Sequence, residues 1–423
     1  MPHSGAGRKM SKAKKSFVIA TTIGSVVALV GIIMATSANF VFDLMLRTQM
    51  VLSPNSANFP FWSDLPAPIR TSMFVFNVSN PEQFLAGLEK PKLVEVGPFV
   101  FDEFHQKVGL VWNSNGTVTY KQIRTFQFDA KASKASLDDK LVILNIPAAT
   151  VGATAAKLPK ITRGLMNVGL KAIGEKLFVE KTARQILFDG YEDPLLDAAE
   201  FIHKFNVPIP GIMDKFGFYY GRNGSDWWDG VFNMFTGSNN LHRLGEIAAW
   251  NYTGHTSYFP GVCGDVRGVA DFFPPYMPDS RVDLFSNDLC RPIELSFNGW
   301  DWVEGVPGKS YRVEPSYFAN SFENPENFCF ELGPTPLPSG IYNASACRFG
   351  APIFMSQPHF YQVSLLMSQP HFYQVSLLMA QPHFYQVSLL MAQTYFCQVR
   401  VFSCLHLRLF WFWSQPHFYH VSL

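Results

Sequence analysis

The segment Asn251–Phe360 begins with NYTGHTSYFPGVCG (residues 251–264) and ends with CRFGAPIFMSQPHF (residues 347–360). It contains four of the six cysteines of the chain, which are Cys263, Cys290, Cys329 and Cys347. Two N-x-S/T sequons lie in this segment and three lie upstream, with acceptor residues Asn77, Asn115, Asn223, Asn251 and Asn343. Cytosolic thiols stay reduced and cytosolic asparagines are not glycosylated. The segment therefore predicts a folded region in an oxidising compartment outside the cytosol.

The N-terminus provides a route to that compartment. Residues Phe17–Phe42 read FVIATTIGSVVALVGIIMATSANFVF and carry no charge, and the basic residues before them are Arg8, Lys9, Lys12, Lys14 and Lys15. A helix needs ~20 apolar residues to span a bilayer, and the flanking cations favour a cytosolic N-terminus. A cleaved signal peptide is the alternative, but its apolar region usually has only roughly 7–15 residues. We expect a cytosolic basic tail (residues 1–16) and an uncleaved transmembrane signal-anchor helix (residues 17–42).

The sequence after this helix is typical of short strands. Met73–Val78 is rich in aromatic and β-branched residues, and Lys92–Phe104 repeats that composition. Thr117–Phe128 alternates polar and apolar residues after a turn at Asn113–Gly116. Short strands that are separated by turn signals at such spacing favour an all-β barrel or sandwich rather than βαβ units. The predicted fold class is α+β, mainly β.

A helical region, Ala148–Phe188, interrupts the strands. Apolar residues recur at helical spacing in two series, on a helix that Pro159 could begin: Ile161, Leu165, Val168 and Ala172, and Met166, Leu170, Ile173 and Leu177. The part Lys157–Arg184 contains seven basic and two acidic residues, a net charge of +5. Such a run is often only a solvated helix face, but it can also attract anionic ligands through its electric field. The candidate ligand-binding residues are Lys157, Lys160, Arg163 and Lys171.

Motifs for catalysis are missing from the sequence. No G-x-S-x-G elbow, H-E-x-x-H pair, P-loop or G-x-G-x-x-G loop occurs at the start of a predicted helix. The histidines are scattered without the spacing of metal ligands. We therefore expect no enzyme, no cofactor, no metal site and no nucleic-acid partner. A luminal enzyme with a single membrane anchor stays an alternative of a different class, but it needs a nucleotide or metal site.

Several motifs, taken in order, resemble the class B scavenger receptor family, which includes fatty acid translocase, the lysosomal integral membrane protein and insect sensory neuron membrane proteins. They are FNVSNP (76–81), EVGP (95–98), GYEDP (190–194), DGVF (229–232), FFPP (272–275), LFSNDLCR (284–291), NFCF (327–330) and CRFGAPIFMSQPHF (347–360). The resemblance covers the chain from the anchor to about Phe360, and as a set these motifs are highly specific.

The resemblance implies an antiparallel β-barrel ectodomain (residues 43–360) with a helical bundle at its apex and an apolar tunnel through the barrel. The partners implied are lipids, fatty acids, sterols or lipoproteins, and the location implied is the plasma membrane or the lysosome. Four cysteines allow three pairings, and the resemblance selects Cys263–Cys329 and Cys290–Cys347. Handing odorants to a receptor, as in a sensory neuron membrane protein, is an alternative within the family. A purely structural adhesion ectodomain without a tunnel is a further alternative.

The C-terminal region departs from the family pattern. Residues 356–391 contain three near-identical copies of SQPHFYQVSLLM, and degraded copies follow. The family continues here with further strands and a second membrane span, but the last apolar stretch, Val401–Trp413, is too short for one and contains Arg408. We expect residues 361–423 to form a poorly ordered repeat tail and the ectodomain to be incomplete. A truncated copy without function is therefore another alternative, and the sequence does not predict an oligomeric state.

Overall fold

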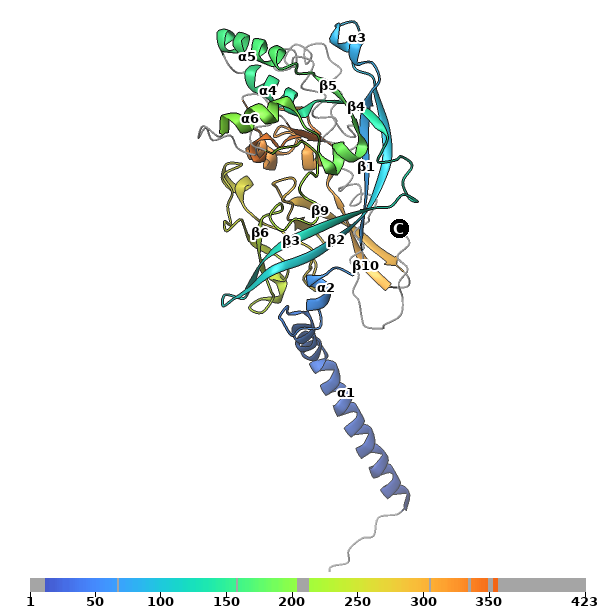
Figure 1. The fold of residues 1–423 in the computed structure, drawn as a ribbon. Helices are drawn as coiled ribbons and strands as arrows, with labels where there is room; N and C mark the ends of the chain where they lie inside the picture. Colours follow the sequence, from blue (N-terminus) through green and yellow to red (C-terminus); the bar gives the residue numbers. More distant parts are fainter. Residues whose placement is uncertain are drawn as a thin grey trace, which may run out of the picture.

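A computed structural model describes residues 12–66, 68–156, 159–203, 213–303, 306–333, 336–348 and 353–356. Within them, one long helix leads into a folded body (residues 51–356) in which the paired strands are antiparallel (Figure 1). The predicted repeat tail and Lys157 lie outside the described residues.

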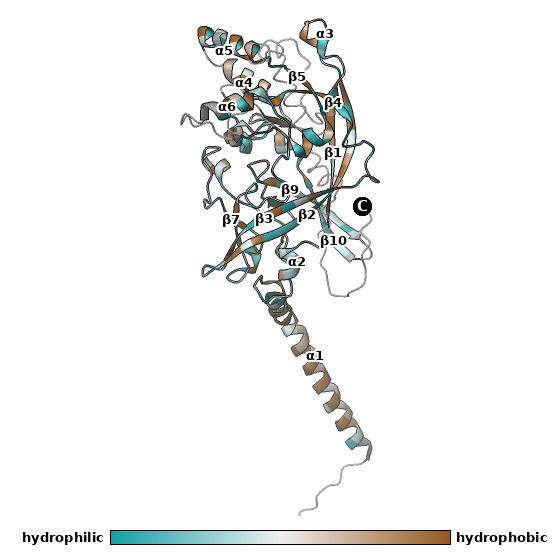
Figure 2. Ribbon diagram, in the orientation of Figure 1, coloured by the Kyte–Doolittle hydropathy of each residue, from teal (hydrophilic) through white to brown (hydrophobic). Residues whose placement is uncertain are grey.

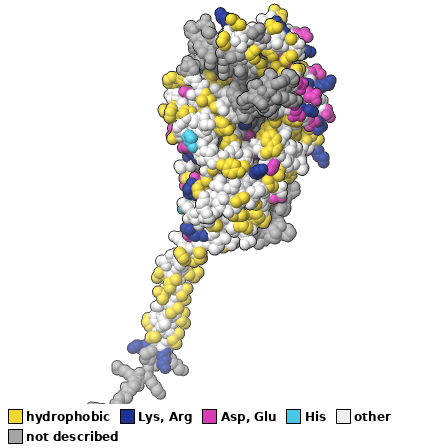
Figure 3. Space-filling view, turned by 60° about the vertical axis from the view of Figure 1, so that its left-hand side comes forward, with side chains coloured by type: hydrophobic (Ala, Val, Ile, Leu, Met, Phe, Trp, Pro, Cys, Tyr) yellow, Lys and Arg dark blue, Asp and Glu magenta, His cyan; other side chains and the backbone are white. Residues whose placement is uncertain are grey.

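The long helix α1 (Lys12–Met50) has 39 residues, and among the described helices it alone is long and apolar enough to cross a membrane. Its residues are largely apolar (Figure 2), and their side chains are exposed along most of its length (Figure 3). The last turns differ, because Leu46 is buried and the Tyr276 hydroxyl donates a hydrogen bond to Asp43 Oδ1 at 3.1 Å. The helix is therefore longer than the predicted anchor, since its C-terminal end packs against the folded body.

The largest sheet has five antiparallel strands in the order β1-β2-β3-β6-β7. Its strands are β1 (Ile69–Val78), β2 (Leu93–Asn113), β3 (Thr117–Phe128), β6 (Val231–Phe235) and β7 (Ile247–Trp250). The predicted turn between β2 and β3 is confirmed, and Gly116 in this turn has a φ of +77°, which glycine adopts without strain. Alternation along β3 buries Val118, Tyr120 and Phe126, as the polar–apolar pattern predicts.

Three smaller sheets complete the described strands. They are β10-β9-β8, β4-β5 and β11-β12, formed by β4 (Lys140–Leu144), β5 (Phe178–Thr182), β8 (Arg281–Leu284), β9 (Ile293–Val303), β10 (Val306–Val313), β11 (Ile341–Asn343) and β12 (Phe354–Ser356). The fold is thus a mixed α+β fold with several antiparallel sheets. The described strands do not form the closed barrel that we predicted, because the five-stranded ladder ends at β1 and β7. Single bridges from Val269 to Glu246 and Leu284 connect the two larger sheets instead.

The helices of the folded body are short. They are α2 (Phe59–Ser63), α3 (Pro81–Leu85), α4 (Ile146–Ala156), α5 (Lys160–Ala172) and α6 (Pro194–His203), with single turns η1 (Gln185–Asp189), η2 (Leu241–Arg243), η3 (Gly261–Gly264), η4 (Pro315–Phe318), η5 (Pro325–Phe330) and η6 (Ser345–Cys347). Helices α4, α5 and α6, here called the apical helices, lie at the end opposite to α1 (Figure 1).

Helix α5 begins after Pro159, as the sequence indicates. It ends earlier than the apolar spacing suggests, because Gly174 takes a φ of +71° and the chain turns into β5. Leu177 therefore lies outside the helix, and the prediction of a continuous helical pattern through this residue is wrong.

Three apolar clusters hold the folded body together. The first packs β1 and β2 against β4 and β5, and Met73, Phe99 and Ile143 lie fully buried in it. The second surrounds the four cysteines, and the third joins the end of α1 to β3, β6 and β7. Because the third cluster includes Leu46, burial of apolar surface fixes α1 on the folded body.

Candidate functional site

The apical helix α5 carries three of the four predicted ligand-binding residues. Lys160 and Lys171 are exposed and Arg163 is half-buried. Since successive helical residues rotate by ~100°, the three side chains fall within ~80° of the circumference. They make a basic stripe on one face of α5, and within the described part of the chain none of them forms an ion pair. Lys157 is not among the described residues, so its place in the stripe stays a prediction.

An apolar stripe runs beside these basic residues. Ile161 is 82% exposed and Val168 is 67% exposed. They are seven residues apart, so they lie on one side of α5, next to the basic stripe. Helix α5 thus offers cationic and apolar side chains to solvent together, and this combination suits an amphipathic anion such as a fatty acid.

A second group of charged residues lies inside the molecule, where sequence reasoning did not find it. This buried charged cluster consists of Glu103, His105, Lys107, Arg124, Arg222, Asp229, Asp271 and Asp288. When His105 is protonated, the cluster contains four cationic groups and four carboxylates, and a further cation, Arg348, lies 4.0 Å from Asp288, so every carboxylate has a cationic partner. Charges are tolerated in a protein interior only when they are paired in this way.

One half of the cluster is built on β2. His105 Nε2 lies 2.7 Å from Glu103 Oε1, and His105 Nδ1 lies 3.6 Å from Asp271 Oδ2. Lys107 Nζ donates to that same oxygen at 2.6 Å. Burial alone would lower the pKa of His105, but the neighbouring carboxylates of Asp271 and Glu103 raise it above the usual 6.5. Burial would likewise raise the pKa of Glu103, but His105 and Arg124 hold it below the usual value.

The other half of the cluster joins segments that are far apart in the sequence. Arg124 Nε lies 2.7 Å from Asp229 Oδ2, and Arg222 lies 2.7 Å from Asp229 and 2.9 Å from Asp288. Burial would raise the pKa of Asp288, but the charges of Arg222, Arg124 and Arg348 lower it to about 2. These carboxylates and cations form ion pairs with one another. The cluster is therefore suited to joining β2 and β3 to the rest of the body.

The sequence contained one signal for this cluster. Glu103, His105 and Lys107 alternate along β2, so these three charged or titratable side chains share one face of the strand. Their distant partner is Asp271, which pairs with both His105 and Lys107 and lies 164 residues beyond Lys107. No periodicity within a strand predicts such long-range pairs.

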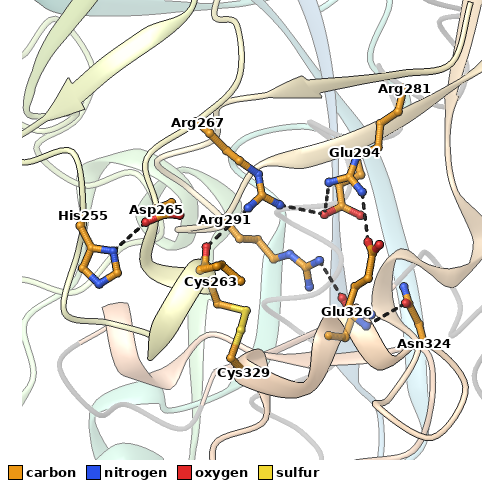
Figure 4. Close-up of a disulfide and its surroundings, with 12 residues drawn as sticks. His255, Cys263, Asp265, Arg267, Arg281, Arg291, Glu294, Asn324, Glu326 and Cys329 are labelled. Atoms are coloured by element: carbon orange, nitrogen blue, oxygen red, sulfur yellow. Dashed lines mark hydrogen bonds and ion pairs between the residues drawn. A yellow bond between two sulfur atoms is a disulfide. The ribbon is translucent and has the colours of Figure 1, made fainter.

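Cys263, Cys290, Cys329 and Cys347 form two disulfide bonds. Cys263 joins Cys329 with a Cα–Cα distance of 5.8 Å, and Cys290 joins Cys347 with one of 6.3 Å. These are the pairs that the resemblance implies. Figure 4 shows the first bridge beside a group of ion pairs, in which Glu294 lies 2.7 Å from Arg281.

The five sequon asparagines all lie in described segments. Asn115, Asn223 and Asn251 are exposed, whereas Asn77 and Asn343 are half-buried. Each side-chain oxygen accepts a hydrogen bond from a nearby backbone or hydroxyl group. Among the described residues, no hydrogen bond is donated by the Nδ2 atoms, to which a glycan would be attached. Attachment of glycans to these five asparagines stays a prediction.

No group of three or more His, Cys, Asp or Glu side chains suited to holding a metal ion occurs among the described residues. Together, these features define a disulfide-bonded body of antiparallel sheets that carries one helix long and apolar enough to cross a membrane. Comparison with known proteins then gives the family.

The chain belongs to the CD36 family, whose sequence profile matches residues 22–382. It is 34% identical over 344 residues to Scavenger receptor class B member 1 of Rattus norvegicus, covering 80% of this chain and 65% of that protein. It is 34% identical over 324 residues to Protein peste of Drosophila melanogaster, covering 76% of this chain and 58% of that protein. It is 35% identical over 327 residues to Lysosome membrane protein 2 of Mus musculus, covering 76% of this chain and 65% of that protein.

The resemblance to class B scavenger receptors is therefore confirmed. Scavenger receptors of this family are not enzymes, which agrees with the prediction from the sequence. The chain spans 58–65% of the length of these three relatives.

Proposed function

We propose that this chain is a membrane-anchored scavenger receptor that captures lipids or lipoproteins at its apical helices. Membership of the CD36 family supports the receptor class. The observation that carries the proposal is the exposed surface of α5, where Lys160 and Lys171 lie beside Ile161 and Val168. The apical helices lie at the end of the body away from α1, so this surface would face the surroundings and not the membrane (Figure 1).

The chemistry of this surface suits ligands that are both anionic and apolar. The ammonium groups of Lys160 and Lys171 would attract carboxylates or phosphates, and the exposed Ile161 and Val168 would contact acyl chains. The electrostatic part of this attraction is screened beyond ~10 Å at 0.1 M salt. Fatty acids, anionic lipids and the surfaces of lipoproteins share this chemistry.

The fate of the ligand after capture is a further part of the proposal. We infer from the family that an apolar tunnel through a β-barrel ectodomain would accept lipids or sterols and lead them toward the membrane. In this arrangement residues 1–16 are cytosolic, residues 17–42 span the membrane and residues 43–360 form the ectodomain. The ectodomain would be extracellular at the plasma membrane or luminal in the lysosome, and the two disulfide bonds suit either compartment.

Charge reversal on α5 tests the capture step. The variant Lys160→Glu/Lys171→Glu should bind less labelled lipoprotein and less fluorescent long-chain fatty acid, with the larger loss at low salt. Adding Arg163→Glu should weaken capture further. The matched control is Lys131→Glu/Lys134→Glu, which reverses the charges of two exposed lysines on the loop after β3. Equal binding by both double variants at low salt would remove α5 from the mechanism.

A further inference from the structure

Two tryptophans are exposed side by side on the hairpin formed by β9 and β10. Trp300 is 64% exposed and Trp302 is 65% exposed. They are two residues apart on one strand, so both indoles lie on the same face of the hairpin. Their partners on β10 are Lys309 and Pro307. Large aromatic side chains on a soluble surface are costly, so a shared face of this kind marks a contact with something apolar.

The hairpin is fixed to the loop that directly precedes β8. Lys309 Nζ lies 2.7 Å from Asp279 Oδ1, 5.6 Å from the ring centre of Trp300, and donates a hydrogen bond to the carbonyl oxygen of Met277. The hydroxyl of Tyr311 donates to the carbonyl oxygen of Pro278 at 2.6 Å. The two indoles therefore stand on a strand pair that is anchored at residues 277–279.

This same loop is bonded to α1. Tyr276, one residue before the anchoring segment, donates its hydroxyl hydrogen to Asp43. Asp43 is the first charged residue after the apolar run Phe17–Phe42, so it marks the place where α1 leaves the hydrocarbon core of a bilayer. One residue spans only ~1.5 Å of helix, so no spacer separates the bilayer from the folded body.

The tryptophan hairpin consequently lies at the membrane end of the body. Figure 1 shows β10 directed toward the end from which α1 emerges, and the short helix α2 lies at that end too. Helix α2 exposes another aromatic side chain there, because Phe61 is 61% exposed. Trp is enriched at membrane–water interfaces, where its ring is partly in acyl chains and its N–H meets polar groups.

We propose that the β9–β10 hairpin is a second membrane contact, in which Trp300 and Trp302 enter the headgroup region of the leaflet from which α1 emerges. This contact would set the tilt of the folded body on the bilayer, because it would hold the body at a point other than α1. The inference rests on α1 spanning the membrane, and it is independent of the ligand that the apical helices capture.

Quenching of tryptophan fluorescence by brominated lipids tests the contact. The full chain is placed in nanodiscs of phosphatidylcholine whose acyl chains carry bromine, and its emission is compared with that in unbrominated nanodiscs. Bromine should quench the wild-type protein, and the quenched fraction should largely disappear in Trp300→Phe/Trp302→Phe. The matched control is Trp227→Phe, since Trp227 is 61% exposed but lies on the segment between Arg222 and β6. This control should keep the quenched fraction.

Two results would overturn the inference. The first is the same quenched fraction in the double variant, in the control and in the wild type. The second is a dimer, stable in detergent, that the wild type and the control form but the double variant does not, while quenching is the same in all three proteins. This result would assign the tryptophan face to contact with a second copy of the chain. A melting temperature and disulfide pattern equal to wild type establish that the double variant is folded.

Discussion

His105 Nε2 lies 2.7 Å from Glu103 Oε1 on the buried face of β2, and Asp271 faces the other ring nitrogen. Of the charged neighbours, Lys107 pairs with Asp271 and Arg124 approaches Glu103 at 3.4 Å. The two carboxylates favour the cationic form of His105, because Glu103 Oε1 lies within hydrogen-bond distance of Nε2 and the charge of Asp271 attracts the imidazolium. The protonation of this one imidazole is therefore linked to the stability of the whole cluster.

We expect stability to fall as the pH rises above neutrality. The pKa of His105 is raised above 6.5 in the folded protein, so its contribution is fully present below pH 6.5 and is lost as the pH rises through the raised pKa. The pKa of Glu103 is lowered from 4.5, so its contribution is lost only as the pH falls through that lowered value. The melting temperature, measured from about pH 6 to about pH 9, should decline in the wild-type protein.

The variant His105→Gln should lack most of this decline, because it cannot titrate. His255→Gln is the control, since His255 also lies beside a carboxylate, Asp265 at 2.8 Å, but is exposed. This control should keep the slope of the wild-type protein. The same slope in His105→Gln would show that another group titrates in this range.

Removal of one carboxylate from the buried charged cluster should be severe. Asp288→Ala leaves Arg222 without one of its two carboxylate partners in a buried site, and loss of one member of such a pair costs about 3–5 kcal/mol. Asp226→Ala breaks an exposed pair with Lys121, at 2.8 Å, and should cost far less, because solvent screens the attraction between exposed charges. Urea denaturation of the two variants measures the contrast. Equal losses of unfolding free energy would contradict the structural role given to the cluster.

Sequence patterns within one segment predicted those elements whose formation depends on neighbouring residues. The apolar run of α1, the turn before Gly116 and the helix start at Pro159 each depend on neighbouring residues, and all three are found. The end of α5 was missed for a local reason as well. Apolar spacing continued past Ala172, but the left-handed conformation of Gly174 ended the helix.

Contacts between residues that are far apart in the sequence could not be predicted from the sequence. The buried charged cluster depends on β2 residues pairing with Asp271 and on Arg124 of β3 pairing with Asp229 and Asp288, and no pattern within one segment specifies these contacts. The barrel came from the family resemblance, yet among the described residues hydrogen bonds between strands stop at β1 and β7. The side chain of Asn77 on β1 accepts a hydrogen bond from Val142 N on β4, which brings these strands together without a ladder.

Glycosylation gives a test of topology. Expression in cells with a secretory pathway should give a band whose mobility increases after treatment with an N-glycosidase, because the sequons lie on the predicted extracytosolic side of α1. Asn115→Gln and Asn251→Gln should each remove one mobility step, since both residues are exposed and their Nδ2 atoms are free of hydrogen bonds to described residues. Asn239→Gln alters an exposed asparagine outside any sequon and should leave the band unchanged. A band that is insensitive to the glycosidase would refute the topology.

The two disulfide bonds should differ in their effect on stability. Their sequence separations, 66 and 57 residues, are so similar that chain entropy predicts roughly 4 kcal/mol for each. The surroundings are not similar, because Cys263 and Cys329 are buried in the second apolar cluster, whereas Cys290 and Cys347 are half-buried.

Removal of the buried bridge should therefore cost more. Cys263→Ala/Cys329→Ala loses the loop constraint and also leaves a cavity, which adds to the loss of unfolding free energy. Cys290→Ala/Cys347→Ala loses mainly the constraint, because its site can relax toward solvent. Urea denaturation without reductant measures both losses, and peptide mapping of the non-reduced wild-type protein checks the pairing itself. A peptide that joins Cys263 to Cys290 would refute the assignment, and a larger loss from the half-buried bridge would show that loop constraint, not burial, decides the difference.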